Sequence, residues 1–262
     1  MLKAMSLDLK VAYIDGDDLM PRLDELKSSG EKLNNIDTGE GFFEQNMPPL
    51  SANAYLGCWA IKEALDQGAD IVICPRVTDA AVVMGPAAWK YDWNKNDFNK
   101  LAGALAAGHI IECGAQATGG NYSFFHEVPS FEKIGYPIAE IKEDGSFYIT
   151  KHENTGGLVS VGTVTAQLLY EISSPDYLNP DVISHFDTLK IEEVGKDRVY
   201  ISGTKGSPPP PTHKVCMNLS GGYKNGMELI VTGLDIPEKA KIFTDELFRS
   251  LGGKEQFDDV SI

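Results

Sequence analysis

The apolar residues of the first half of the chain fall into runs typical of an α/β fold. LKVAYI at residues 9–14 and IVIC at residues 71–74 predict strands, and the second is apolar enough to be buried on both faces of a parallel sheet. Between them, apolar positions at helical spacing predict a helix from an N-cap at Ser51 to Asp66. We therefore expect an α/β region with a mainly parallel sheet and flanking helices.

Two further helices complete the predicted first half. One begins at Thr78 or Asp79 and is closed by Pro86, and the other runs from an N-cap at Asp97 to Glu112. The first of them starts directly after the apolar strand at residues 71–74. Open α/β sheets place their ligands beyond the carboxyl ends of such strands, so this turn is a candidate site.

Beyond residue 130 the pattern changes to short strands joined by tight turns. Glu143-Asp144-Gly145 separates two alternating runs, which is typical of a β-hairpin. A β-rich α+β second half with hairpins is therefore predicted. Its other expected elements are a helix at 158–172, a hairpin at 189–202, strands at 215–219 and 227–232, and a helix at 237–251. We expect residues 1–130 to form the α/β part and residues 131–262 to pack on it, or both to make one continuous domain.

Composition and charge restrict the kinds of molecule that the chain is expected to bind. The 262 residues are 42% hydrophobic and carry a net charge of −15, which argues against nucleic acid and anionic membrane as partners. No apolar run approaches the roughly 18 residues of a membrane-spanning helix, and no signal pattern opens the chain. The four cysteines are scattered without a C-x-x-C pair. These features predict a soluble cytoplasmic protein with reduced thiols.

The helix end at residues 109–113 carries candidate chemistry. His109 and Cys113 are one helical turn apart, and Glu112 lies on the adjacent edge. These three groups could supply a nucleophile and a general base, or two metal ligands. The alternative is a core histidine, a small apolar cysteine and a solvated glutamate near a helix end.

Glycine-containing turns supply candidate binding loops. Gly119-Gly120, flanked by Gln116 and Asn121, would let the backbone approach a ligand closely, although Gly-Gly turns are common. Thr155-Gly156-Gly157 opens a predicted helix and could form an anion nest. No Walker or G-x-G-x-x-G pattern is present, so no nucleotide cofactor is predicted.

Three charged residues outside the glycine turns, namely Arg76, Asp79 and Lys214, are further candidates. Arg76 offers a fork for a carboxylate or phosphate, with Thr78 and Asp79 at the helix start. A helix cap that pairs with Arg76 explains these residues equally well. Lys214 follows the proline run 208–211 and could reach the same group. We expect the turns at 76–79, 112–120 and 155–157 to surround one cavity.

A metal site is a weaker alternative. Asp17 and Asp18 follow the first strand and, with His109 and Glu112, could hold a divalent cation for hydrolysis. The 12-residue calcium-loop pattern is absent, and a solvated acidic turn explains these aspartates better. No metal site is therefore predicted, and a divalent metal stays an open alternative.

Several of these tracts together resemble a known family. ADIVICPRVTDAAVVMGP, AAGHIIECGAQATGGNYS and GYPIAEIKEDGSFYITKHENTGGLVSVGTVTAQLLYEI, in this order, are similar to the acyclic terpene utilisation (AtuA-like) family. The resemblance covers roughly residues 7–250. Family members usually carry a further N-terminal α/β segment and continue past the counterpart of helix 237–251, so the chain looks truncated at both ends.

The resemblance implies a function class but not a reaction. It points to a catabolic enzyme that acts on a branched acyl-CoA or a related carboxylate, with a CoA thioester as substrate. Lyase or hydratase chemistry is expected from the candidate carboxylates instead, because they suit proton transfer. Asp79, Glu112, Cys113 and His109 are then the candidate catalytic groups. A non-catalytic binding or assembly subunit, or an inactive truncated member, is the alternative. Either way we expect a small-molecule ligand and a homo-oligomer or partner subunit.

Overall fold

The computed structural model describes residues 2–45 and 47–262 of the chain. The chain forms two compact units, residues 1–220 and residues 221–262, and each is described by itself. The first unit contains all eleven strands found in the described residues and five of the six α-helices.

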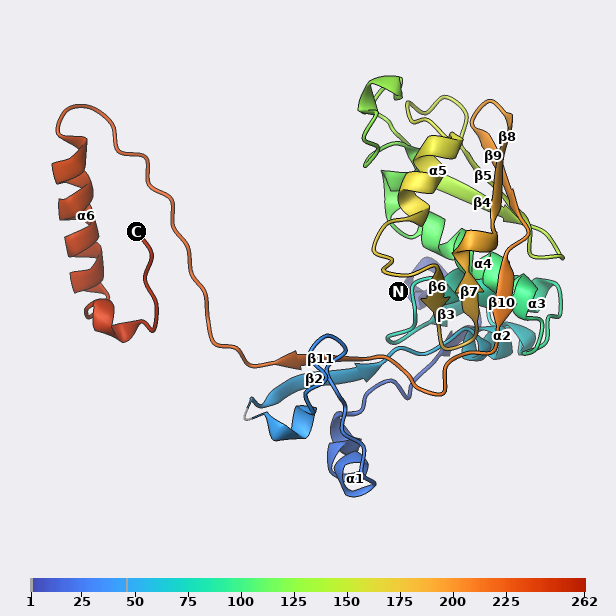
Figure 1. Cartoon of the computed structure of the whole chain (residues 1–262), viewed down its shortest axis with the longest axis horizontal. Coiled ribbons are helices and arrows are strands. Elements are labelled where there is room, and N and C mark those ends of the chain that lie inside the picture. The colour runs from blue at the N-terminus through green and yellow to red at the C-terminus, as the bar shows by residue number, and fades with distance from the viewer. Residues whose placement is uncertain (1, 46) are drawn as a thin grey trace. The chain divides into compact units, whose positions relative to one another are not determined.

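Helix α4 (Phe98–Ile111) forms the centre of the first unit. Every residue from Leu101 to Ile110 is buried, so the helix is covered on all sides, as its Ala-rich and Leu-rich sequence favours. It packs against α3 (Ala81–Lys90) and α5 (Val161–Leu168), and also against strands of two different sheets (Figure 1). The polar residues that follow its last turn are thereby held against the core.

The strands form four small sheets. A four-stranded antiparallel sheet has the order β4-β5-β9-β8, a three-stranded antiparallel sheet has the order β10-β7-β6, β11 pairs with β2 antiparallel, and β1 pairs with β3 parallel. Their bounds are β1 Val11–Tyr13, β2 Pro49–Ala54, β3 Ile71–Ile73, β4 Pro137–Ile141, β5 Phe147–Lys151, β6 Asp176–Leu178, β7 Ile183–His185, β8 Lys190–Gly195, β9 Arg198–Ser202, β10 Lys205–Ser207 and β11 Val215–Leu219.

The fold is therefore mixed α/β, and the expected mainly parallel sheet is not found in the first half. Among the strand pairs of the described residues, only β1 and β3 run parallel. β3 is also less buried than its apolar sequence suggests, since the side chain of Ile73 is 57% exposed. The remaining helices of this unit are short, namely α1 (Leu23–Ser28) and α2 (Trp59–Asp66).

The first half of the predicted helix 51–66 is a strand instead. Residues 49–54 form β2, whose side chains alternate so that Ala52 and Ala54 are buried, and helix α2 begins only at Trp59. β11, about 160 residues further along the chain, supplies the pairing partner of β2. Because β propensity depends strongly on such tertiary context, the local helical spacing did not decide the structure.

Other boundaries differ from the predicted ones in smaller ways. Helix α3 begins at Ala81 rather than at Thr78 or Asp79, and Pro86 lies inside it rather than closing it. The helix predicted at 158–172 is α5, which begins after a capping box between Ser160 and Thr163. The hairpin around Asp144-Gly145 is confirmed, with Gly145 at φ +83° and Asp144 Oδ1 accepting from Ser146 N at 3.0 Å.

The second unit contains helix α6 (Ile236–Ser250), which confirms the predicted last helix, while the strand predicted at 227–232 is absent from the described residues. No residue of α6 is buried within the described structure. The ring of Phe248 contacts that of Phe257 at 5.8 Å between centroids. Across the parts of the chain described, no helix combines the length and the apolar character that crossing a bilayer requires.

Candidate functional site

The turn between β3 and α3 lies against the last turns of helix α4. Gly108 of α4 makes this approach possible, because a Cβ added there would lie 2.8 Å from the Cα of Ala80. The close packing places Asp79 beside the helix end that carries His109, Glu112 and Cys113. Two of the predicted parts of the site, 76–79 and 109–113, are thereby brought together.

His109 is buried, with one ring nitrogen hydrogen-bonded to a backbone carbonyl and the other close to the carboxyl group of Glu112. Its side chain is 1% exposed, and Nε2 lies 3.2 Å from the carbonyl oxygen of Leu168. Because a carbonyl only accepts, Nε2 carries a proton. Nδ1 lies 3.2 Å from Glu112 Oε1, but the two are not aligned for a hydrogen bond, and Nδ1 has no other partner among the residues described.

The contact between the His109 ring and the Glu112 carboxyl group is attractive only if an additional proton lies on one of the two side chains. With Nε2 already protonated, Nδ1 presents a lone pair toward a carboxylate unless the imidazole or the acid carries an additional proton. The side chain of Glu112 is 15% exposed, so little water is present to separate the two groups. The pair therefore places a ring nitrogen and a carboxyl group close together at the end of α4.

Tyr177 belongs to the same cluster and was not predicted from the sequence. Its ring stacks on Phe186, with centroids 5.2 Å apart and planes at 13°, and lies 5.2 Å from the ring of His109. Burial, aided by the negative charges of Glu112 and Asp79, raises the pKa of Tyr177 to about 12. Its phenol therefore remains a hydrogen-bond donor across the physiological pH range.

Cys113 lies near the same carboxylates. Burial raises the pKa of its thiol, a hydrogen bond with Gln167 opposes that shift, and the charge of Glu112 adds to it. The net direction favours the neutral thiol over the thiolate that a nucleophile requires. Glu171, which has a left-handed backbone with φ +58°, contributes a further negative charge to this cluster.

Arg76 and Lys214 are brought together by an aromatic side chain. The guanidinium carbon of Arg76 lies 4.8 Å from the centre of the Tyr55 ring, and Lys214 Nζ lies 5.4 Å from it. Arg76 also donates from Nη2 to Asp79 Oδ1 at 2.9 Å. The backbone bond from Tyr55 N to Lys214 O, at 2.9 Å, holds the segment around Lys214 in this position.

Thr78 connects the turn to a buried polar segment, Asn179-Pro180-Asp181. Its Oγ1 accepts from Asn179 Nδ2 at 3.0 Å, and Asp181 Oδ2 accepts from the backbone N of Cys58 at 2.8 Å. Burial raises the pKa of Asp181, and hydrogen bonds from Cys58 oppose the rise. Asp181 lies so close to Gly57 that no Cβ fits there. The segment fixes the start of α2 and the 76–79 turn to each other.

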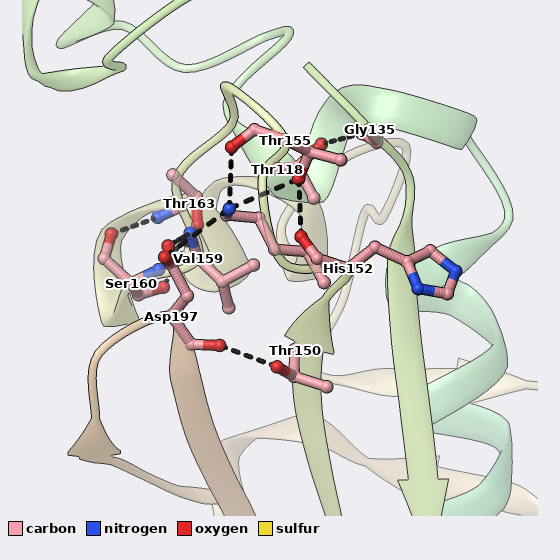
Figure 2. Close-up of polar contacts among 10 residues, drawn as sticks. Thr118, Gly135, Thr150, His152, Thr155, Val159, Ser160, Thr163 and Asp197 are labelled. Carbon is pink, nitrogen blue, oxygen red and sulfur yellow. Dashed lines mark hydrogen bonds and ion pairs between the residues drawn. The ribbon is translucent and has the colours of Figure 1, made fainter. Parts of the chain in front are cut away.

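The third predicted part of the site, at 155–157, lies in a different polar cluster (Figure 2). Lys151 Nζ donates to Thr155 O at 3.0 Å and lies 3.5 Å from Asp197 Oδ2, and Thr118 Oγ1 donates to Gly135 O at 2.6 Å. The 3₁₀ helix Gly114–Thr118 leads from Cys113 to this cluster. At about 2 Å per residue it spans roughly 10 Å, so the two clusters are neighbours and not one group.

The glycine backbones of the predicted binding loops are engaged within the chain. Gly156 N donates to Lys133 O at 2.7 Å, and Gly157 N donates to Ile134 O at 2.9 Å. Gly119 and Gly120 close the 3₁₀ helix by donating to Gln116 O at 3.0 Å and Ala115 O at 2.9 Å. In this conformation their N–H groups are not free to form the expected anion nest.

The polar side chains of that loop and the surface hollows complete the geometry. Asn121 Nδ2 donates to Gln116 Oε1 at 3.5 Å. A hollow of about 410 Å³ borders the second cluster, and another of about 200 Å³ lies in the 27–44 region. Neither is lined by His109, Glu112 or Arg76, so the expected single cavity is not formed by these hollows. Their linings are Ser130, Glu132, Lys133, Asn154, Thr155 and Gly156 for the first, and Lys27, Gly30, Glu31, Lys32, Gly41, Phe43 and Glu44 for the second.

Over residues 1–262 the chain matches the family model described as acyclic terpene utilisation family protein AtuA. The chain belongs to this family. No curated protein and no solved structure matches it.

In this member of the AtuA family, the aspartates considered as metal ligands stabilise a turn. Asp17 Oδ2 accepts from Asn53 Nδ2 at 2.8 Å and from Arg76 N at 3.2 Å, and Asp18 Oδ1 accepts from Met20 N at 2.9 Å. Burial would raise the pKa of Asp17, but these hydrogen bonds outweigh it and lower the pKa. Across residues 2–45 and 47–262, no three His, Cys, Asp or Glu side chains are grouped as metal ligands.

Three residues of this AtuA-family site carried weak sequence signals. Tyr55 follows β2 directly, where the sequence suggested the middle of a helix. Asp181 follows Asn179 and Pro180, and an Asn-Pro-Asp sequence beside a short apolar run is typical of a turn. Tyr177 lies in β6, a three-residue strand with an exposed, half-buried, exposed pattern that periodicity does not resolve.

Proposed function

We propose that this AtuA-family chain is a catabolic enzyme that acts on a branched acyl-CoA or a related carboxylate by proton transfer, in lyase or hydratase chemistry. The observation that carries the proposal is the meeting of the His109–Glu112 pair with the protonated phenol of Tyr177 at the end of α4. The family name, which refers to branched terpene chains, supports the substrate class.

In the proposed step one acid–base group, Glu112, moves a proton from carbon to oxygen. In the elimination direction, Glu112, assisted by His109, accepts the proton from the carbon next to the substrate carbonyl. The electrons of that C–H bond form the new double bond as the β-hydroxyl leaves. The departing hydroxide takes the proton that Glu112 has accepted, so that water is released and Glu112 is again a carboxylate. Hydration is the same step in reverse.

Tyr177 is the proposed hydrogen-bond donor to the substrate carbonyl oxygen. Negative charge builds on this oxygen as the carbon proton leaves, and a fixed donor in a partly buried site stabilises that charge. A phenol with a raised pKa keeps its proton while donating, which suits this role. Cys113 is proposed as a neutral neighbour that lines the site and not as a nucleophile.

A second candidate is a binding or assembly subunit, and the sheet β1–β3 favours it. This sheet has only two strands, and the side chains of Tyr13 and Ile73 are 77% and 57% exposed. Two-stranded sheets with exposed apolar side chains are rarely stable alone, because their edges lack partners. A second copy of the chain or a partner subunit would cover these strands.

The experiment that tests the enzyme proposal is exchange of the substrate α-proton. Branched acyl-CoAs and branched carboxylates are first screened by thermal shift, since a ligand that binds the folded chain stabilises it by mass action. Each stabilising compound is then incubated in D₂O and followed by NMR. Deuterium at the α-carbon, lost in Glu112→Gln, supports the proposal. Binding without exchange or turnover supports the binding-subunit candidate instead.

A further inference from the structure

The cations Arg76 and Lys214 both face one aromatic ring although they are far apart in the chain. Lys214 lies just after the proline run 208–211, and the strand pair β2–β11 aligns it with Tyr55. Their charged groups lie 4.8 and 5.4 Å from the ring centre. In a chain of net charge −15, two cations that contact the same aromatic ring form a local exception.

The hydrogen-bonding capacity of these two cations is only partly used. Arg76 donates from Nε and Nη2 to the carbonyl of Val77 and from Nη2 to Asp79, which leaves Nη1 without a partner among the residues described. Within those residues, Lys214 Nζ forms no ion pair and no hydrogen bond. Asp79 offsets the charge of Arg76, so Lys214 supplies the remaining positive charge.

We infer that Tyr55, Arg76 and Lys214 form a binding site for a carboxylate carried by the substrate, close to its reacting carbon. Arg76 presents Nη1 to one oxygen, and Lys214 acts as a point charge on the other. The Tyr55 ring orients both cations and provides an apolar surface for the adjoining carbon chain. The site thus assigns the substrate to the class of branched dicarboxylates or their monothioesters.

The position of the site favours a carboxylate over a phosphate of CoA. Asp79 pairs with Arg76 at 2.9 Å and is also one of the charges that act on Tyr177 and Cys113. Asp79 therefore links the anion site to the proton-transfer groups, because it contacts Arg76 and its charge also acts on Tyr177. In an acyl-CoA the long pantetheine arm separates the phosphates from the thioester, whereas a carboxylate on the acyl chain lies only a few bonds from it.

The inference rests on the proposed function for the identity of the reacting group, but it is tested by binding alone. Isothermal titration calorimetry measures the affinity of 3-methylglutarate for the wild-type chain and for Lys214→Gln, Lys214→Arg and Tyr55→Leu. Lys205→Gln is the matched control, since Lys205 lies on the other side of the same proline run and is exposed. CoA and inorganic phosphate are titrated in parallel to identify the anion.

We expect Lys214→Gln to weaken 3-methylglutarate binding about tenfold, which is the loss of one charged hydrogen bond. Lys214→Arg should restore most of the affinity, Tyr55→Leu should weaken it, and Lys205→Gln should leave it unchanged. The inference is overturned if wild type does not bind the dicarboxylate, if phosphate or CoA binds through Lys214 in its place, or if the two glutamine variants behave alike. Binding without α-proton exchange would instead defeat the enzyme proposal and leave the anion site in place.

Discussion

His109 Nδ1 and Glu112 Oε1 lie 3.2 Å apart on one face of α4, with the opposite ring nitrogen of His109 fixed by the carbonyl of Leu168. The fixed Nε2 proton leaves only Nδ1 to interact with the acid. A ring nitrogen and a carboxyl oxygen thus lie together at the end of a buried helix, which is the arrangement that the proposed abstraction of a proton from carbon uses.

Glu112→Gln should abolish activity without unfolding the chain. The amide has nearly the shape of the acid and should keep the helix end in place, but it cannot accept a proton from a carbon atom. We expect a loss of roughly 10²–10⁴-fold in turnover, the usual contribution of a general base. Steady-state kinetics and a thermal melt measure the two effects separately. Glu63→Gln, on the exposed face of α2, is the matched control, and full activity in Glu112→Gln would remove the base from the mechanism.

Cys113→Ala should retain activity within about threefold, because the raised pKa of this thiol leaves little thiolate at neutral pH. Iodoacetamide labelling of Cys113, followed across pH by mass spectrometry, should rise only above the value of about 8.5 for a free thiol. Labelling that is complete near neutral pH, together with an inactive alanine variant, would show that the cysteine is a nucleophile.

The secondary structure that depends on local signals was predictable. The hairpin around Asp144-Gly145 and helix α4 follow from a turn residue pair and from a long apolar run. Strand β2 did not follow, because its partner β11 lies about 160 residues away and its alternation covers only a few small residues. The prediction of a mainly parallel sheet was wrong for the same reason, because packing across the whole unit decides which strands pair.

The candidate site was predictable in its residues more than in its grouping. Arg76, Asp79, His109, Glu112 and Cys113 meet because Gly108 allows α4 to approach the turn closely, and a helical periodicity argument does not measure that distance. The loop at 155–157 was assigned to the same cavity, yet its glycine N–H groups are used by carbonyls of residues 133 and 134. Tyr177 and Asp181 were missed because their burial arises from long-range contacts.

Gly108→Ala should destabilise the chain and disturb the site together. The added Cβ would lie 2.8 Å from both the Cα and the Cβ of Ala80, so α4 and the start of α3 must separate. We expect a loss of roughly 1–3 kcal/mol of unfolding free energy, reduced by the better helix propensity of alanine. Urea denaturation measures it. Gly226→Ala, where a Cβ meets no atom within 4 Å, should be neutral, and equal stability of the two variants would contradict the packing argument.

Asp181→Asn should remove a pH dependence of stability. Because burial raises the pKa of Asp181 above its unfolded value, the folded chain holds this proton more tightly than the unfolded chain does. Stability linked to this group is therefore full below the ordinary aspartate pKa of 3.8 and is lost as pH rises through the raised folded pKa. Asn keeps an acceptor for Cys58 N and carries no charge. Its melting temperature relative to wild type should increase between acidic and neutral pH, and a constant difference would contradict the shift.

Tyr177→Phe tests the proposed donor to the substrate oxygen. Phenylalanine keeps the stacking on Phe186 and the contact with His109 and removes only the hydroxyl, so the melting temperature should change little. Turnover should fall by roughly 10²–10³-fold, as when one oxyanion donor is removed, with a much smaller change in KM. Tyr200→Phe, on the four-stranded sheet, is the control. If Tyr177→Phe instead raised KM alone, the hydroxyl would bind the ground state, and the stabilisation of a developing negative charge would have to come from another group.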